Sequence, residues 1–167
     1  MKVLVSAASR HGSTVEVAAT IGAVLGAAGH EVYILAPEEI TGFDGYDAAV
    51  IGSAVYVGRW IEPARELVER HKVALARIPV WLFSSGPVGD PPRPYEDPGD
   101  ALALAAQVGA RGHRSFSGLV DKRRLGIAER AMVAAVRVSE GDYRSWEDIE
   151  AWAREIAAAL AAEPGPA

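Results

Sequence analysis

Residues 2–14 of this chain, KVLVSAASRHGST, decide the fold. The first six of them are apolar enough to form a buried strand, and the last six form a polar turn from which a helix begins. Such a turn directs backbone N–H groups, hydroxyls and the positive end of the helix dipole to one point, which suits a phosphate group. Ser9, Ser13 and Thr14 supply the hydroxyls. Gly12 lets the backbone approach a ligand closely because it has no Cβ.

The same residues also fit a simpler interpretation. Ser13 and Glu16 have the spacing of a capping box, which any ordinary helix start can show. However, this turn holds more hydroxyls than a cap requires, and it follows the first strand at the end where open α/β sheets bind ligands. We therefore expect the turn to bind one phosphate group.

Length and composition indicate one domain, spanning residues 1–162, with a disordered tail at 163–167. The net charge of −5 argues against a nucleic-acid-binding protein. The absence of cysteine excludes disulfides, thiolate metal sites and cysteine nucleophiles, and fits a reducing cytoplasm. We assign no metal site and expect neither a secretion signal nor a membrane span, whereas peripheral contact with a membrane stays open.

Strands and helices alternate along the chain. Strands are expected at 2–7, 31–35, 47–53, 78–84 and 112–119, and helices from 13, from 61, at 101–108, at 124–138 and at 146–162. This order predicts an α/β fold: a doubly wound, five-stranded parallel sheet of order 2-1-3-4-5 with helices on both faces. The loops after strands 1, 3 and 4 then meet at the carboxyl edge of the sheet.

Known nucleotide and phosphate sites of such sheets limit the choice of ligand. The chain has no Gly-x-Gly-x-x-Gly and no Gly-x-x-x-x-Gly-Lys-Ser/Thr, and it also lacks the acidic pair of a phospho-acceptor domain and a hydrolase Gly-x-Ser-x-Gly. What fits is a ligand with one terminal phosphate and a flat ring, the shape of flavin mononucleotide (FMN). Tyr56 is expected to contact the ring, and Trp60 either stacks on the ring or packs in the core. Residues 86–100, rich in Pro, Gly and acids, form an irregular loop that could close as a lid.

Ser9-x-x-Gly12-x-Thr14 resembles the phosphate loop of flavodoxins. Three longer stretches resemble the flavodoxin-fold protoporphyrinogen dehydrogenases that use menaquinone: Ala7–Thr14, Gly52–Trp60 and Leu119–Leu160. The last stretch includes Asp121-x-x-Arg124 and Trp146-x-x-Ile149. This resemblance, which covers nearly the whole chain, implies a flavodoxin-like fold, FMN as cofactor, and hydride or electron transfer.

The resemblance also implies which residues bind the cofactor. The residues implied to hold the phosphate are Ser9, Arg10, His11, Gly12, Ser13 and Thr14. Those implied to frame the isoalloxazine ring are Ala54, Val55, Tyr56, Val57, Gly58, Ser85, Gly86, Pro87, Val88 and Gly89. No catalytic side chain is assigned, because the cofactor itself carries the redox chemistry.

Two functions follow from a bound FMN. The first is an FMN-dependent oxidoreductase acting on a small redox-active molecule, a quinone or a porphyrinogen-like compound. The second is a flavodoxin-type electron carrier that serves a redox protein and turns over no substrate; a fold that has lost its cofactor is a third interpretation. The net charge of −5 is mild for a carrier, which favours the enzyme. Other polar residues are expected to be structural or solvated: His30, His71, His113, Arg111, Arg114, Lys122, Arg123 and Arg124.

Overall fold

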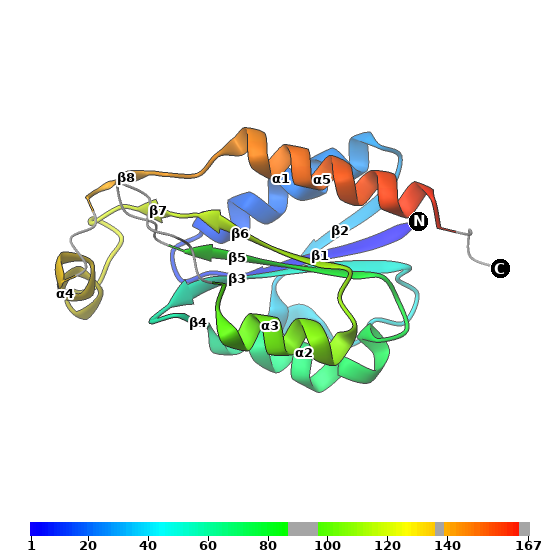
Figure 1. Ribbon diagram of the computed structural model, residues 1–167, viewed down its shortest axis with the longest axis horizontal. Coiled ribbons are helices and arrows are strands. Elements are labelled where there is room, and N and C mark those ends of the chain that lie inside the picture. Colours follow the sequence, from blue (N-terminus) through cyan, green and yellow to red (C-terminus); the bar gives the residue numbers. More distant parts are fainter. Residues whose placement is uncertain (87–96, 136–138, 164–167) are drawn as a thin grey trace.

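The computed structural model describes residues 1–86, 97–135 and 139–163. Its main sheet has the order β2-β1-β3-β5-β6, and every neighbouring pair along this order is parallel (Figure 1). The strands are β1 (Lys2–Ala8), β2 (Glu31–Leu35), β3 (Ala48–Tyr56), β5 (Val80–Gly86) and β6 (Gly112–Ser117). The order 2-1-3-4-5 predicted from the sequence is therefore confirmed.

Helices cover both faces of the sheet (Figure 1). One face carries α1 (Ser13–Ala27) and α5 (Trp146–Ala161), and the other carries α2 (Glu62–Leu75) and α3 (Gly99–Val108). Alternate strand residues supply the two cores: Val50 packs on the α1 and α5 side, and Ile51 on the α2 and α3 side. Ser145 caps α5 by accepting from the backbone N–H of Asp148 at 3.3 Å, as the sequence predicts.

Several boundaries differ from the sequence-based ones. β3 continues to Tyr56 and turns back into the short antiparallel strand β4 (Arg59–Trp60), so the predicted second loop is mostly a hairpin. The fifth predicted strand divides into β6 and β7 (Leu119–Val120), and β7 pairs with β8 (Gly141–Asp142) in a separate small sheet. A single 3₁₀ turn, η1 (Pro37–Glu39), follows β2.

The helix predicted at 124–138 begins later, as α4 (Ile127–Ala135), and residues 136–138 lie outside the described part. Its start is delayed because Asp121 accepts from the backbone N–H of Arg123 and Arg124, which forms a turn first. Residues 164–167, most of the expected tail, also lie outside the described part. None of the helices in the described ranges has the length and apolarity to cross a membrane.

Gly52 offers a direct test of the packing between β3 and β5. A Cβ built at Gly52 would overlap the ring of Phe83, which is fully buried and packs against Phe116 and Trp152. We expect Gly52→Ala to lower the free energy of unfolding by about 1–3 kcal/mol, because a filled core must shift to admit the methyl group. Urea unfolding followed by circular dichroism measures this change.

Gly26 is the matched control. It lies inside α1, and a Cβ there meets nothing within 4 Å. Gly26→Ala should therefore raise stability by about 0.5–1 kcal/mol through helix propensity. Equal destabilisation by both substitutions would contradict the packing described for β3 and β5.

Candidate functional site

The candidate site lies at the carboxyl edge of the sheet, where β1, β3 and β5 end. The turn Ser9–Gly12 follows β1, the hairpin tip Val57–Gly58 follows β3, and Ser85–Gly86 close β5. Ala54 of β3 is paired with Ser85 of β5, so the last two segments are direct neighbours. The structure therefore brings together the described residues of all three predicted segments. Pro87, Val88 and Gly89 lie outside the described residues, as does most of the lid predicted at 86–100.

The start of α1 is not the capping box that Ser13 and Glu16 could have formed. The N-cap residue is Gly12, with φ +87° and ψ −13°, and no side chain caps the helix. Instead, Ser9 Oγ accepts the backbone N–H of Gly12 at 3.0 Å. Because a left-handed φ is unfavourable for residues with a Cβ, glycine suits this position, and the space where a Cβ would stand is open for 4 Å.

Several donors at this turn point to an anion. The first bond of α1 runs from the N–H of Glu16 to the carbonyl of Gly12 at 3.1 Å, so the N–H groups of residues 13–15 have no intrahelical acceptor. The hydroxyl of Thr14 is 1% exposed and has no hydrogen-bond partner among the described residues. Free N–H groups, a buried hydroxyl and the positive end of the helix dipole together suit one phosphate group.

Two arginines from the segment after β6 hold the carbonyl groups of this turn. Arg124 Nη1 donates to the carbonyl of His11 at 3.1 Å, and Arg144 Nη1 donates to that of Ser13 at 3.3 Å. The Arg144 side chain is nearly buried and also pairs with Asp142 at 2.8 Å and with Glu16 at 2.5 Å. These arginines fix the turn from its carbonyl side, and the N–H groups of residues 13–15 stay available.

A carboxylate from α4 lies beside the same turn. Glu129 is 3.1 Å from His11 Nε2 and 3.3 Å from Arg10 Nη1, and it accepts from the N–H of Gly126 at 2.8 Å. The Gly126 N–H lowers the pKa of Glu129 below its usual value, and the bonds from His11 and Arg10 lower it further. Glu129 is therefore an anion that already occupies the two basic side chains of the turn.

The hairpin after β3 carries strain at its tip. Val57 and Gly58 both have positive φ, +52° and +69°, as a two-residue tip of the I′ kind requires, and this is unfavourable for a β-branched valine. The Val57 side chain is 78% exposed. Tyr56 lies under the guanidinium of Arg10, 4.3 Å from its ring centre, which joins the hairpin to the turn after β1. Burial raises the pKa of Tyr56, the charge of Glu129 raises it further, and Arg10 opposes both.

Trp60 does not face a ligand. Its side chain is buried at 2% exposure, and its indole N–H donates to Ser84 Oγ at 2.7 Å. The expectation that Trp60 might stack on a flat ring is therefore wrong, and the alternative of core packing is confirmed. Tyr56, half-buried beside Arg10, stays the aromatic residue for ring contact.

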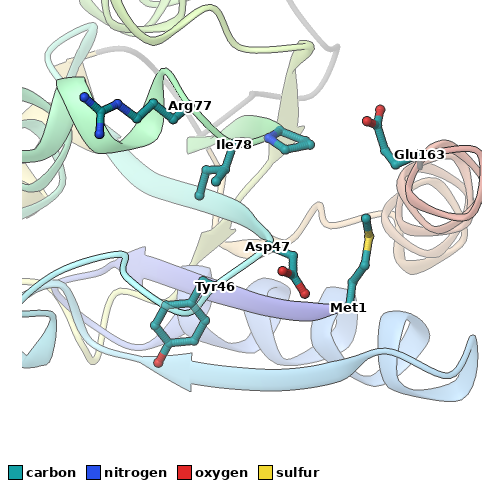
Figure 2. Close-up of a pocket in the computed structure, with 7 residues that line it drawn as sticks. Met1, Tyr46, Asp47, Arg77, Ile78 and Glu163 are labelled. Carbon is teal, nitrogen blue, oxygen red and sulfur yellow. The ribbon is translucent and has the colours of Figure 1, made fainter. Parts of the chain in front are cut away.

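Other parts of the described chain offer no comparable site. A hollow of about 200 Å³ opens at the opposite end of the sheet, where Met1 and Asp47 precede β1 and β3, and its lining includes Ile78 and Glu163 (Figure 2). Within residues 1–86, 97–135 and 139–163, no group of His, Cys, Asp or Glu side chains could hold a metal ion.

Sequence reasoning did not single out Glu129 or Arg144 as site residues, and it set Arg124 aside as a solvated charge. One signal was available: a chain leaving β6 emerges at the carboxyl edge, so the segment that follows must lie near the turn after β1. The particular partners were not readable, because 118 residues separate His11 from Glu129 along the chain.

The chain matches the flavodoxin domain family over residues 4–146. It matches no curated protein sequence. Among solved structures it is similar to a flavodoxin from the domain Archaea, with a TM-score of 0.66 at 13% identity over 96% of this chain and 99% of that one. A Streptococcus flavodoxin gives a TM-score of 0.63 at 17% identity over 95% and 99% of the two chains.

A larger protein contains the same fold. Rubredoxin oxygen:oxidoreductase from Desulfovibrio gigas matches with a TM-score of 0.66 at 16% identity, over 96% of this chain but only 36% of that chain. These low identities show a shared fold, and the family match rests on most of the sequence. The chain therefore belongs to the flavodoxin domain family.

Proposed function

We propose that this protein binds FMN at the carboxyl edge of its sheet and acts as an FMN-dependent oxidoreductase. In this proposal it moves electrons or hydride between the flavin and a small redox-active organic molecule, of the quinone or porphyrinogen-like class. The start of α1 is the observation that carries the proposal: the buried Thr14 hydroxyl and the N–H groups of residues 13–15 have no partner among the described residues. Homologues of the flavodoxin domain bind FMN, which supports this choice of ligand.

The residues present fit this cofactor. The Thr14 hydroxyl and the N–H groups of residues 13–15 would hold the single phosphate, and the open space over Gly12 admits it. Tyr56 and the tip Val57–Gly58 would face the ring from one side, and Ser85–Gly86 from another. When bound, FMN supplies reversible transfer of one or two electrons, so the chain needs only to bind, orient and shield the ring.

The charges around this edge favour a small substrate over a protein partner. Carriers that dock on basic proteins present a face of one sign. Here both signs lie side by side, because Arg10 and His11 pair with Glu129, and Arg123 and Arg124 pair with Asp121. The alternative of a flavodoxin-type electron carrier is supported by a different observation: the chain spans 99% of the length of the flavodoxins it resembles.

Thr14 tests the phosphate site. We expect Thr14→Val to weaken FMN binding about 10- to 100-fold, because a hydrogen bond to a charged group contributes about 1.5–3 kcal/mol. Fluorescence titration of the FMN-free protein with FMN measures the dissociation constant. Riboflavin, which lacks the phosphate, should bind the variant and the wild type equally.

Thr20→Val is the matched control, since Thr20 lies in the same helix and its hydroxyl donates to the carbonyl of Glu16. It should leave FMN affinity unchanged. If Thr14→Val binds FMN as tightly as the wild type does, the phosphate does not lie at the start of α1.

Glu129 tests the charge balance at the same turn. We expect Glu129→Gln to raise FMN affinity about three- to tenfold, because it removes a negative charge near the phosphate and releases Arg10 and His11. Glu155→Gln breaks an exposed ion pair between Glu155 of α5 and Arg114 of β6, and it should leave FMN affinity unchanged. Weaker FMN binding by Glu129→Gln would mean that Glu129 positions the turn more than it repels the ligand.

Stepwise reduction separates the enzyme from the carrier. For an oxidoreductase we expect reduction of the FMN-loaded protein by two electrons without a long-lived one-electron form, together with turnover of quinones or porphyrinogens. Absorbance spectra during anaerobic titration, followed by steady-state assays, give both readouts. A stable one-electron form with no turnover would favour the electron carrier.

A further inference from the structure

A line of polar side chains, buried at Trp60, Ser84 and His113 and exposed at Asp97, runs beneath the hairpin that carries Tyr56. Trp60 Nε1 donates to Ser84 Oγ at 2.7 Å, and this oxygen lies 2.8 Å from His113 Nε2. On the other side of the imidazole, His113 Nδ1 lies 3.5 Å from Asp97 Oδ1, and Asp97 also accepts from Ser115 Oγ at 2.6 Å. The line therefore connects the hairpin after β3 to β5, β6 and the residues before α3.

The hydrogen-bonding groups of Trp60 and His113 determine which atom donates in each of these contacts. An indole N–H can only donate, so Ser84 Oγ is its acceptor, and the Ser84 proton is free to be donated to His113 Nε2. The remaining ring nitrogen, Nδ1, makes no hydrogen bond among the described residues, and the carboxylate of Asp97 lies 3.5 Å away from it. A neutral His113 that accepts the Ser84 proton at Nε2 therefore carries its own proton on Nδ1.

Burial rules out a hydrolytic role for this Ser-His-Asp arrangement. Ser84 is 0% exposed and the His113 side chain 5% exposed, so no substrate can reach the hydroxyl. Burial also lowers the pKa of His113, an effect that the charge of Asp97 partly opposes. The arrangement instead fixes the position of Trp60.

Trp60 is the point at which the hairpin is held. Its backbone N–H donates to Asp100 at 3.0 Å, and the N–H of Ile61 donates to Ser53 Oγ at 3.1 Å. The strained tip lies three residues before Trp60, and strain of this kind persists only where surrounding contacts hold it. The indole bond to Ser84 is one of these contacts, and it depends on how Ser84 is shared with His113.

We propose that His113 is a positioning residue for Tyr56 and the hairpin tip Val57–Gly58. The neutral imidazole orders Ser84 and Trp60, and protonation of Nε2 disturbs both. A protonated Nε2 becomes a donor, so Ser84 must accept two protons and its own proton loses its acceptor. The effect on FMN binding rests on the function proposed above, whereas the effect on the hairpin does not.

Within residues 1–86, 97–135 and 139–163, one titratable group faces the His113 ring. Asp97 faces Nδ1, and Asp100 of α3 is occupied by the backbone N–H groups of Trp60 and Ala101. On β6 itself, Arg114 pairs with Glu155, and β5 faces the ring with the uncharged Ser84. If the hairpin signals change below pH 6.5 in the wild type but not in His113 variants, the cause is therefore the protonation of His113.

The first test uses the FMN-free protein. We expect ¹⁵N NMR to show a neutral, Nδ1-protonated His113 at pH 7.5, titrating below the usual value of 6.5. The Trp60 indole N–H and the backbone amides of 56–58 should shift with the same midpoint. A proton on Nε2 at pH 7.5 would overturn the proposal. So would NMR signals of the tip that do not change as His113 titrates.

The second test uses three variants. His113→Gln keeps an acceptor near Ser84 but cannot titrate, so its tip signals should stay constant between pH 7.5 and 5. His113→Leu removes the acceptor, so it should show the disturbed signals over the whole of this pH range. His71→Gln is the matched control, because His71 lies on α2 against Phe43, and should behave as the wild type. If His113→Leu does not fold, the contrast between wild type and His113→Gln still decides.

FMN affinity gives the functional readout. Acidification from pH 7.5 to 5 should weaken FMN binding about three- to tenfold more in the wild type than in His113→Gln, the range of one neutral hydrogen bond. The comparison removes the pH effects that both proteins share, such as that of the FMN phosphate. Equal weakening would overturn the link to the ligand site, whereas failure of both proteins to bind FMN at any pH would reject the proposed function and leave the NMR tests to decide on His113.

Discussion

The start of α1 imposes the constraint on which the site depends. A helix that begins at a left-handed glycine, directly after a buried parallel strand, cannot satisfy its own first N–H groups. The carbonyl groups of residues 11–13 accept hydrogen bonds from the helix itself and from Arg124 and Arg144, whereas the N–H groups of residues 13–15 have no intrahelical acceptor. Because unsatisfied buried polar groups are costly, an anion bound at these N–H groups would stabilise the turn.

The two sides of the site are built by different means. On the phosphate side, the turn is held mainly by local contacts, since Ser9 and Gly12 are three residues apart. On the ring side, the hairpin is held from below by side chains from β5, β6 and α3, which the chain brings together over 24 to 40 residues. Arg10 over Tyr56 joins the two sides at the surface. A flat ligand lying across them would therefore meet one side built by local contacts and one side whose position depends on residues distant in the chain.

This difference explains how far the sequence could predict the structure. The order of the sheet and the turn after β1 were predictable because they follow from local patterns: apolar strands, amphipathic helices and hydroxyls around one glycine. The extension of β3 to Tyr56 was not, because Val57 occupies a conformation that its residue type disfavours and thus gave no turn signal. Glu129 beside His11 and His113 beside Ser84 are contacts between segments far apart in the chain, and no spacing rule encodes them.

The exposure of α4 determines how freely this segment can vary. In the described part of this helix, which lies apart from the main sheet (Figure 1), no residue is buried, and Glu129 joins it to the turn after β1 through Arg10 and His11. Its loss would remove little apolar contact, so natural selection can remodel this segment without endangering folding. The sheet and its two cores could therefore stay unchanged while the sequence of this segment varies.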